Sequence, residues 1–300
     1  MTIDLKRLDD SLFQEFHAKL KKIYQFHFSF LAALSAEIIL LIALLPFLAR
    51  SGIVAITLAA LLVTLFGYLS LKTYRESLFI DELKQIIDRY GSAISSDLGA
   101  HIPLDKRKGA IAEAYQNLAD RTPIQNYTTI PYLPDLAIQK IYLWIGFGFS
   151  TLKEELLKRA IQNRIEAIKL NPTQAEKHAK LATSYLSLSS HYEKMQNIQQ
   201  HTLSLNRAIE SLKILHDMAP KESTVLQELG AAYRKLSRTQ DEVEVLESWL
   251  KIEPNQPEPL LRLGQLYFTQ GKHALGFKTY EQLKTLDLSK SDELLKSFVI

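Results

Sequence analysis

Two long apolar stretches stand near the amino terminus of this 300-residue chain. Residues 28–49 are interrupted only by Glu37, and residues 53–71 contain no charged side chain. A hydrocarbon core about 30 Å thick is spanned by roughly 20 helical residues, so each stretch predicts a transmembrane helix. Helices of a soluble core normally keep a polar face toward water, and neither stretch has one. We therefore predict a two-helix transmembrane hairpin over residues 28–72.

Cations flank this hairpin unevenly. The connecting turn carries only Arg50, whereas the outer ends carry Lys19, Lys21, Lys22, Lys72 and Arg75. The positive-inside rule then predicts both termini in the cytoplasm and the turn Arg50-Ser51-Gly52 on the far side. We expect a bacterial inner membrane. A signal peptide is disfavoured, because 27 mostly polar and charged residues precede the first apolar stretch.

The segments beside the hairpin have the spacing of amphipathic helices. In the leader, residues 1–27, apolar side chains recur every three or four positions. This leader has two alternative places, on the membrane surface or packed on protein, and its mixed charge favours protein. Beyond the hairpin, the helical pattern continues over residues 73–98 and ends at Gly99 and Pro103.

A proline-containing segment divides the chain further along. Within the helical juxtamembrane region, residues 73–119, a second helix is predicted over Lys106–Ala119 with Asp105 as its N-cap. Residues 120–135 contain three prolines and no helical period. This segment predicts a linker, and residues 136–300 then form the C-terminal domain.

The C-terminal half contains a repeat of 34 residues. The sequence LGAAY at 229–233 recurs as LGQLY at 263–267, and Pro220 and Pro254 are also 34 residues apart. Leu and Tyr four residues apart share a helix face, the glycine permits a close approach of a second helix, and the proline ends that helix. A fixed period of this length indicates stacked helix pairs.

These residues resemble the tetratricopeptide repeat (TPR) family, whose repeats are 34-residue helix-turn-helix units. The matching positions of repeat 223–256 are Leu226, Leu229, Gly230, Tyr233, Leu246, Trp249 and Pro254, with Glu242 in place of the usual small residue. Those of repeat 257–290 are Leu260, Leu263, Gly264, Tyr267, Gly276, Tyr280 and Leu283, with Gly271 at the turn and Leu288 in place of proline. The fold class predicted is all-α: a transmembrane hairpin, a helical middle region and a TPR-like α-solenoid.

Upstream, the repeat keeps its phase but changes its length. Pro172 and Pro220 are 48 residues apart, which predicts a helix pair lengthened by 14 residues, with 187–200 as the inserted turns. Ala160 and Ala167 match an earlier second helix; its first helix would include Trp144, Phe147 and Gly148. The very apolar segment 141–149 has the alternative of docking on the membrane or on residues 84–119.

The resemblance implies a groove lined by the first helix of each repeat, a surface that takes up peptides or helices. The groove positions of the two clear repeats are Thr224, Gln227, Ala231, Arg234 and Lys235, then Glu258, Leu261, Gln265, Phe268 and Thr269; those of the lengthened pair are Glu176, Ala179, Thr183, Leu186 and Ser187. These positions include no asparagine, so a chaperone clamp is not supported, and a peptide or amphipathic helix suits them better. Alternatively, Arg234 and Lys235 belong to an ordinary solvated face.

Glu37 stands near the middle of the first apolar stretch, where a carboxylate is costly and usually faces protein. It indicates a packing or oligomer contact ahead of ion handling. The simplest alternative is a glutamic acid bonded to Ser35, Thr57 or Thr64 of the same hairpin. A homo-oligomer therefore stays open, and Pro46 is expected to bend the last turn of its helix.

Composition and motifs narrow the function. Of 36 basic and 33 acidic side chains, only two fall within residues 28–71, and a net charge of +3 gives no support for nucleic-acid binding. The chain has no cysteine, which excludes thiol catalysis and metal sites with cysteine ligands. Its histidines are dispersed, and no catalytic or phosphate-loop motif accompanies them. We therefore expect no enzymatic activity, no cofactor and no bound metal. The sequence favours a membrane-anchored adaptor that binds a protein; the alternative is an active hairpin, in a channel, transporter or membrane-shaping complex.

Overall fold

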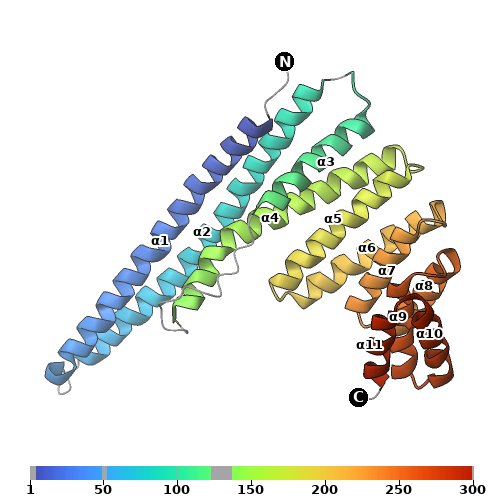
Figure 1. Ribbon diagram of the computed structural model, residues 1–300. Coiled ribbons are helices and arrows are strands. Elements are labelled where there is room, and N and C mark those ends of the chain that lie inside the picture. The colour runs from blue at the N-terminus through green and yellow to red at the C-terminus, as the bar shows by residue number, and fades with distance from the viewer. Residues whose placement is uncertain (1–4, 49–52, 100, 123–136, 299–300) are drawn as a thin grey trace. The chain divides into compact units, whose positions relative to one another are not determined.

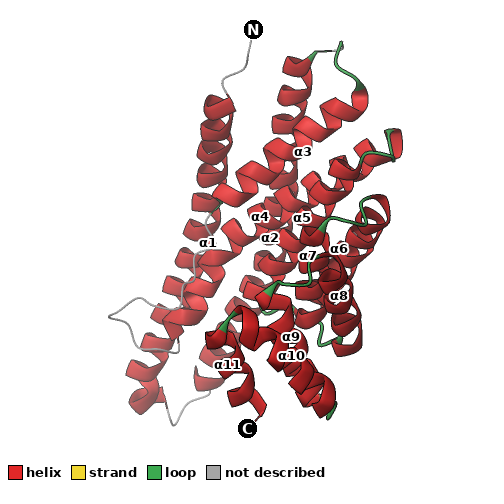
Figure 2. Ribbon diagram, turned by 45° about the vertical axis from the view of Figure 1, so that its right-hand side comes forward, coloured by secondary structure: helices red, strands yellow, loops and turns green. Residues whose placement is uncertain are grey.

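A computed structural model describes the backbone of residues 5–48, 53–99, 101–122 and 137–298, and the side chains of 5–43, 55–99, 101–122 and 148–298. This described part consists of eleven α-helices and contains no strand (Figure 2). The all-α prediction is therefore confirmed.

The two apolar stretches belong to two long antiparallel helices, α1 (Leu5–Leu48) and α2 (Ile53–Leu98), which lie side by side (Figure 1). The leader and the first predicted span form one continuous helix, and α2 continues from the second span to Leu98, as predicted. Both helices are long and apolar enough to cross a membrane. The predicted turn at residues 50–52 lies outside the described residues, as does the side chain of Pro46.

The chain divides into two compact units. The first consists of Met1–Pro103 with Glu113–Arg159, and the second of Leu104–Ala112 with Ala160–Ile300. Two helices, α3 (Leu104–Arg121) and α4 (Ala137–Leu170), contribute to both units.

The core of the first unit explains why the leader is amphipathic. The leader stripe is buried at Leu12, Phe16, Leu20 and Ile23, and Phe16 has no exposed surface. The Phe16 ring lies 5.1 Å from that of Phe149 in α4, edge to face. The leader therefore packs on protein, which was the favoured alternative. Buried residues on the other helices of this unit include Phe79, Leu83, Ile87, Leu118, Leu152 and Leu156.

Helix α3 confirms the predicted helix over 106–119 but corrects its cap. The helix begins at Leu104, Pro103 holds the N-cap position, and no side chain caps the helix. Asp105 lies inside the first turn, where Lys177 Nζ donates to its Oδ2 at 2.7 Å. The predicted linker lies outside the described residues from position 123 onward.

Helix α4 corrects the earlier helix pair that the sequence indicated. The helix runs without a break from Ala137 to Leu170, so residues 148 and 160 belong to one helix and no turn separates them. The sequence between these positions has neither glycine nor proline to end a helix. Gly148 packs against α1, because a Cβ there would lie 2.1 Å from Leu20 Cδ1. The side chains of Trp144 and Phe147 lie outside the described residues.

The second unit contains the predicted helix pairs, which contact one another in chain order (Figure 1). These helices are α5 (Ala175–Lys194), α6 (Ile198–Met218), α7 (Ser223–Lys235), α8 (Thr239–Ile252), α9 (Pro257–Thr269), α10 (His273–Leu286) and α11 (Leu288–Phe298). Each helix of the pair α5–α6 is seven residues longer than its counterpart in α7–α8. The lengthened pair is therefore confirmed, with about two extra turns on each helix.

The turns inside the three pairs share one backbone feature. Gly271 has a φ of +71° between α9 and α10, as expected for a turn glycine, and Ser237, 34 residues earlier, has a φ of +54°. Gln196 in the lengthened pair has a φ of +56°. Each pair thus turns through one left-handed residue, although only one of the three is a glycine.

The two repeat glycines, Gly230 and Gly264, differ in how closely neighbouring side chains approach them. A Cβ on Gly264 would lie 2.6 Å from Leu294 Cδ2 and 2.8 Å from Thr279 Oγ1, so this glycine permits a close approach. A Cβ on Gly230 would meet only Val245 Cγ1 at 3.8 Å, an ordinary contact. The close-approach interpretation is therefore right for Gly264 and wrong for Gly230.

Because of this difference, we expect alanine substitutions at the two glycines to change stability in opposite directions. Gly230→Ala is expected to stabilise the repeat array, helices α5–α11, by about 0.5–1 kcal/mol, because alanine is more favourable than glycine inside a helix by about that amount. Gly264→Ala is expected to destabilise it by about 1–3 kcal/mol through overpacking against Leu294. Urea unfolding of both variants measures the effect, and equal shifts of one sign would contradict the packing described here.

Candidate interaction surface of the repeat array

The predicted groove residues on α7 form an exposed stripe. Thr224, Gln227, Arg234 and Lys235 are all exposed, as is Ala231 between them. They alternate with a buried stripe that packs into the core of the array, at Val225, Leu226, Leu229, Ala232 and Tyr233. Side chains three and four positions apart share one helix face, so the five exposed residues present one continuous surface.

The equivalent positions on α9 are largely covered. Glu258 is exposed and Gln265 is partly buried, but Leu261 and Phe268 belong to a core cluster with Leu294 of α11. The Phe298 ring lies 4.7 Å from that of Phe268. In addition, Lys290 of α11 forms an ion pair with Glu258. Helix α11 therefore occupies the face that sequence reasoning assigned to a ligand.

The sequence carried a signal for this covering helix. Leu294 and Phe298 are four residues apart, with the buried Ser291 on the same face. The predicted repeat 257–290 ends before these residues and does not include most of this helix.

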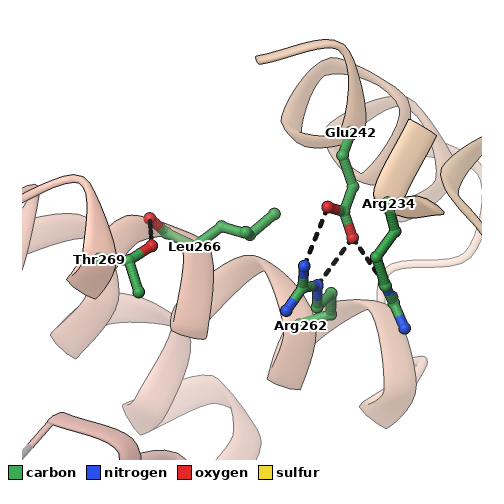
Figure 3. A network of polar contacts seen from close by, with 5 residues as sticks. All are labelled: Arg234, Glu242, Arg262, Leu266 and Thr269. Carbon is green, nitrogen blue, oxygen red and sulfur yellow. Dashed lines mark hydrogen bonds and ion pairs between the residues drawn. The ribbon is translucent and has the colours of Figure 1, made fainter. Parts of the chain in front are cut away.

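A charged network joins three helices of the array beside the α7 stripe (Figure 3). Glu242 of α8 is 2% exposed, and its Oε1 accepts hydrogen bonds from Arg234 Nε of α7 at 2.8 Å and from Arg262 Nε of α9 at 2.7 Å. Arg262 also donates through Nη2 to Oε2 of the same carboxylate at 3.0 Å. One buried carboxylate thus links two consecutive repeats, with two arginines as partners.

The repeat explains the position of this network. Glu242 and Gly276 are equivalent residues, 34 apart, and so are Arg234 and Phe268. At the second pair, a Cβ on Gly276 would lie 2.4 Å from Phe268 Cε1, so an aromatic ring fills the space above a glycine. In the earlier repeat, Arg234 and Glu242 occupy the same two positions and form an ion pair there. Glu242 is unusual within its own repeat, but its partners are not evident from the sequence, because Arg262 belongs to the next repeat.

Electrostatics decide the ionisation of Glu242. Burial alone would raise the pKa of this carboxyl, but the hydrogen bonds from Arg262 and Arg234 outweigh it and hold the pKa below its usual range. The carboxylate therefore stays charged at neutral pH, as a hydrogen-bonded acceptor for both guanidinium groups.

The lowered pKa predicts an acid-dependent loss of stability. A carboxyl with a depressed folded-state pKa stabilises the fold above its unfolded pKa of about 4.3, and this contribution is lost as pH falls through the folded value. Lowering the pH from about 6 to about 3 should therefore reduce the thermal midpoint of the array less in Glu242→Gln than in the unchanged chain. Glu244→Gln, an exposed neighbour on α8, is the matched control and should behave like the unchanged chain.

The second cation of the α7 stripe also has an acidic partner. Lys235 Nζ donates to Glu193 Oε2 of α5 at 2.6 Å, and this hydrogen bond lowers the pKa of Glu193. Both side chains are nearly half exposed, as is Arg234. The stripe is thus tied to its neighbours on both sides while its charged side chains stay about half exposed.

Glu37 lies in the other unit, between α1 and α2. Thr64 Oγ1 donates to Glu37 Oε1 at 3.0 Å, so one of the three partners considered for this glutamate is the right one. Its Oε2 is buried and has no hydrogen-bond partner among the described residues. Within the described part of the chain, no group of three metal-ligating side chains occurs.

Comparison with known proteins assigns the chain to no family. No family model matches the sequence, and no curated protein matches it. The chain is similar to the solved structure of MamA at 19% identity, over 48% of this chain and 85% of that one, with a TM-score of 0.33. It is also similar to TTC0263, a thermophilic TPR protein in Thermus thermophilus, at 18% identity over 65% and 92%, with a TM-score of 0.36. The TPR-like character of residues 175–286 rests on the helix pairs and their 34-residue spacing.

Proposed function

We propose that this protein is a membrane-anchored adaptor whose TPR-like array binds a protein partner, a peptide or amphipathic helix, and assists assembly or recruitment at the membrane. The observation that carries the proposal is the exposed stripe of α7, with Thr224, Gln227, Arg234 and Lys235. The equivalent face of α9 is covered by α11, so the binding surface is centred on α7 and extends toward α5. A solenoid groove of this kind recognises a peptide or a helix. We assign no catalytic activity to the chain.

The anchoring part of the proposal rests on the exposed apolar side chains of α1 and α2. Phe28, Ile39, Ile56, Val63 and Phe66 are each more than 60% exposed, and no described part of the chain covers them. An apolar surface of this extent favours lipid as its surroundings. The cations at the outer ends favour cytoplasmic termini, and hence a cytoplasmic array, in a bacterial inner membrane.

Exchange of the anchor tests whether the array carries the function. The full chain with residues 28–72 replaced by an unrelated two-span hairpin should restore the growth or assembly defect of a strain that lacks the protein. The same chimera with Gln227→Glu and Lys235→Glu should fail, because it adds two carboxylates to the α7 stripe while it leaves the ion pairs of Glu242 intact. Rescue by both chimeras, or by neither, would contradict the adaptor proposal.

A second candidate function follows from Glu37 Oε2, which has no hydrogen-bond partner among the described residues. A buried carboxyl oxygen without a partner in a membrane helix favours a contact with another protein chain. In this alternative the hairpin is the active part, as an oligomerising subunit of a channel, transporter or membrane-shaping complex. Glu37→Gln, introduced alone into the full chain, would then abolish function, whereas the adaptor proposal expects function to persist.

A further inference from the structure

An aromatic cluster closes the end of the hairpin that carries the cations. The rings of Phe26, Phe30 and Tyr68 lie 5.1–6.3 Å from one another, and the Tyr68 hydroxyl is 3.2 Å from His27 Nδ1. These residues stand where the apolar stretches of α1 and α2 give way to polar sequence. Aromatic side chains at such a position are typical of the level of the lipid headgroups.

Five cations and one acid lie beside this cluster, within residues 19–27 and 68–79. Two of the cations have acidic partners: Lys19 pairs with Glu82 at 3.0 Å, and Lys72 with Glu76 at 3.7 Å. The other three, Lys21, Lys22 and Arg75, are exposed and have no acidic partner in the part of the chain that the structure describes. The Arg75 guanidinium lies over the Phe26 ring, 5.6 Å from its centre.

Lys21, Lys22 and Arg75 lie at one level of the hairpin. The contacts Phe16–Phe79 and His27–Tyr68 fix the antiparallel register of α1 and α2. In this register, Lys21 and Lys22 stand opposite residues 73 and 74. Arg75 is therefore displaced from both lysines by less than about 5 Å, one helical turn, along the hairpin axis. Tyr74, 63% exposed, lies at the same level.

We propose that Lys21, Lys22 and Arg75 form a binding site for the phosphate headgroups of anionic phospholipids, with Tyr74 at the headgroup level beside them. This inference rests on the proposed transmembrane hairpin. The charge of the site is complementary to an anionic leaflet, and the apolar surface next to it, at Phe28 and Leu71, is complementary to acyl chains. The site thus binds a lipid as a whole, with a phosphate above and a hydrocarbon tail below.

Spin-labelled lipids test this proposal on the full chain. The chain is reconstituted in phosphatidylcholine vesicles that contain a trace of spin-labelled phosphatidylglycerol or, separately, spin-labelled phosphatidylcholine. The motionally restricted fraction of each label reports its association with the protein. We expect a preference for phosphatidylglycerol of roughly five-fold or more, because one cation near an anionic lipid contributes about that factor. Lys21→Gln, Lys22→Gln and Arg75→Gln together should abolish the preference.

A matched control removes the same charge elsewhere. Lys180→Gln, Lys278→Gln and Lys284→Gln together change three exposed lysines of the repeat array and should leave the preference intact. In the unchanged chain, raising KCl from about 0.05 M to about 0.5 M should also abolish the preference, since the Debye length falls below one helical turn. This arm keeps the proposal testable even where the triple variant fails to fold.

The outcomes separate this inference from the anchoring on which it rests. A chain that leaves the vesicles on alkaline washing would overturn the transmembrane hairpin itself. A chain that stays inserted but shows no lipid preference, or a triple variant that keeps one, would overturn the lipid site alone. Loss of the preference in millimolar inorganic phosphate would assign the site to free phosphate and overturn the assignment to lipid. Persistence under that condition supports it.

Discussion

Replacement of Arg234 and Arg262 by methionine together is expected to lower the free energy of unfolding of the array by about 3–5 kcal/mol. The change leaves Glu242 buried at 2% exposure and without its two cationic partners. A buried charge without a partner is far more costly than the loss of a surface ion pair. Hydrogen exchange of the amides of α7–α10 in the full chain measures the loss where it arises.

Glu242→Ala is the matched control for this prediction. It removes the carboxylate and restores the small residue that the repeat usually has at this position. Both arginines are partly exposed, so they can turn to water once the carboxylate is gone. We expect a loss of about 1 kcal/mol, well below that of the double variant. Equal losses in the two variants would contradict the view that burial of the carboxylate dominates the network.

Leu294→Ala is expected to destabilise the last repeat by about 2–5 kcal/mol, the range for truncating a fully buried leucine. Leu294 has no exposed surface and holds α11 against α9 and α10. Loss of this contact should also expose Leu261 and Phe268, which α11 covers. Hydrogen exchange of α9 and α11 and binding of a hydrophobic dye measure the two effects.

Leu288→Ala provides the comparison on the same helix. Leu288 is 63% exposed at the start of α11, so its truncation should change stability by less than about 0.5 kcal/mol. An effect as large as that of Leu294→Ala would contradict the view that the buried contact of Leu294 holds α11 in place.

The sequence predicts those parts of the fold that local patterns determine. The two apolar stretches, the amphipathic leader and the 34-residue spacing each follow from periodicity within one helix or one helix pair. The lengthened pair α5–α6 was predictable because Pro172 and Pro220, which bracket it, are 48 residues apart instead of 34. The helices appear where these patterns place them.

The parts that sequence reasoning missed depend on contacts between separate elements. Arg262 reaches Glu242 from the following repeat, and α11 covers Phe268 from outside the last full repeat. Periodicity within one helix does not report such contacts. The continuous helix α4 was missed for another reason: Gly148 suggested a repeat position, whereas it permits a close contact with Leu20.

The central claim is that the exposed stripe of α7 binds a protein partner at the membrane. Site-specific photo-crosslinking in native membranes tests it most directly, with the crosslinker at Gln227 in the stripe or at Glu244 on α8, both exposed. We predict a discrete crosslinked protein from Gln227 that is lost on Lys235→Glu, and none from Glu244. Equal products from both positions, or no product from Gln227, would contradict the claim.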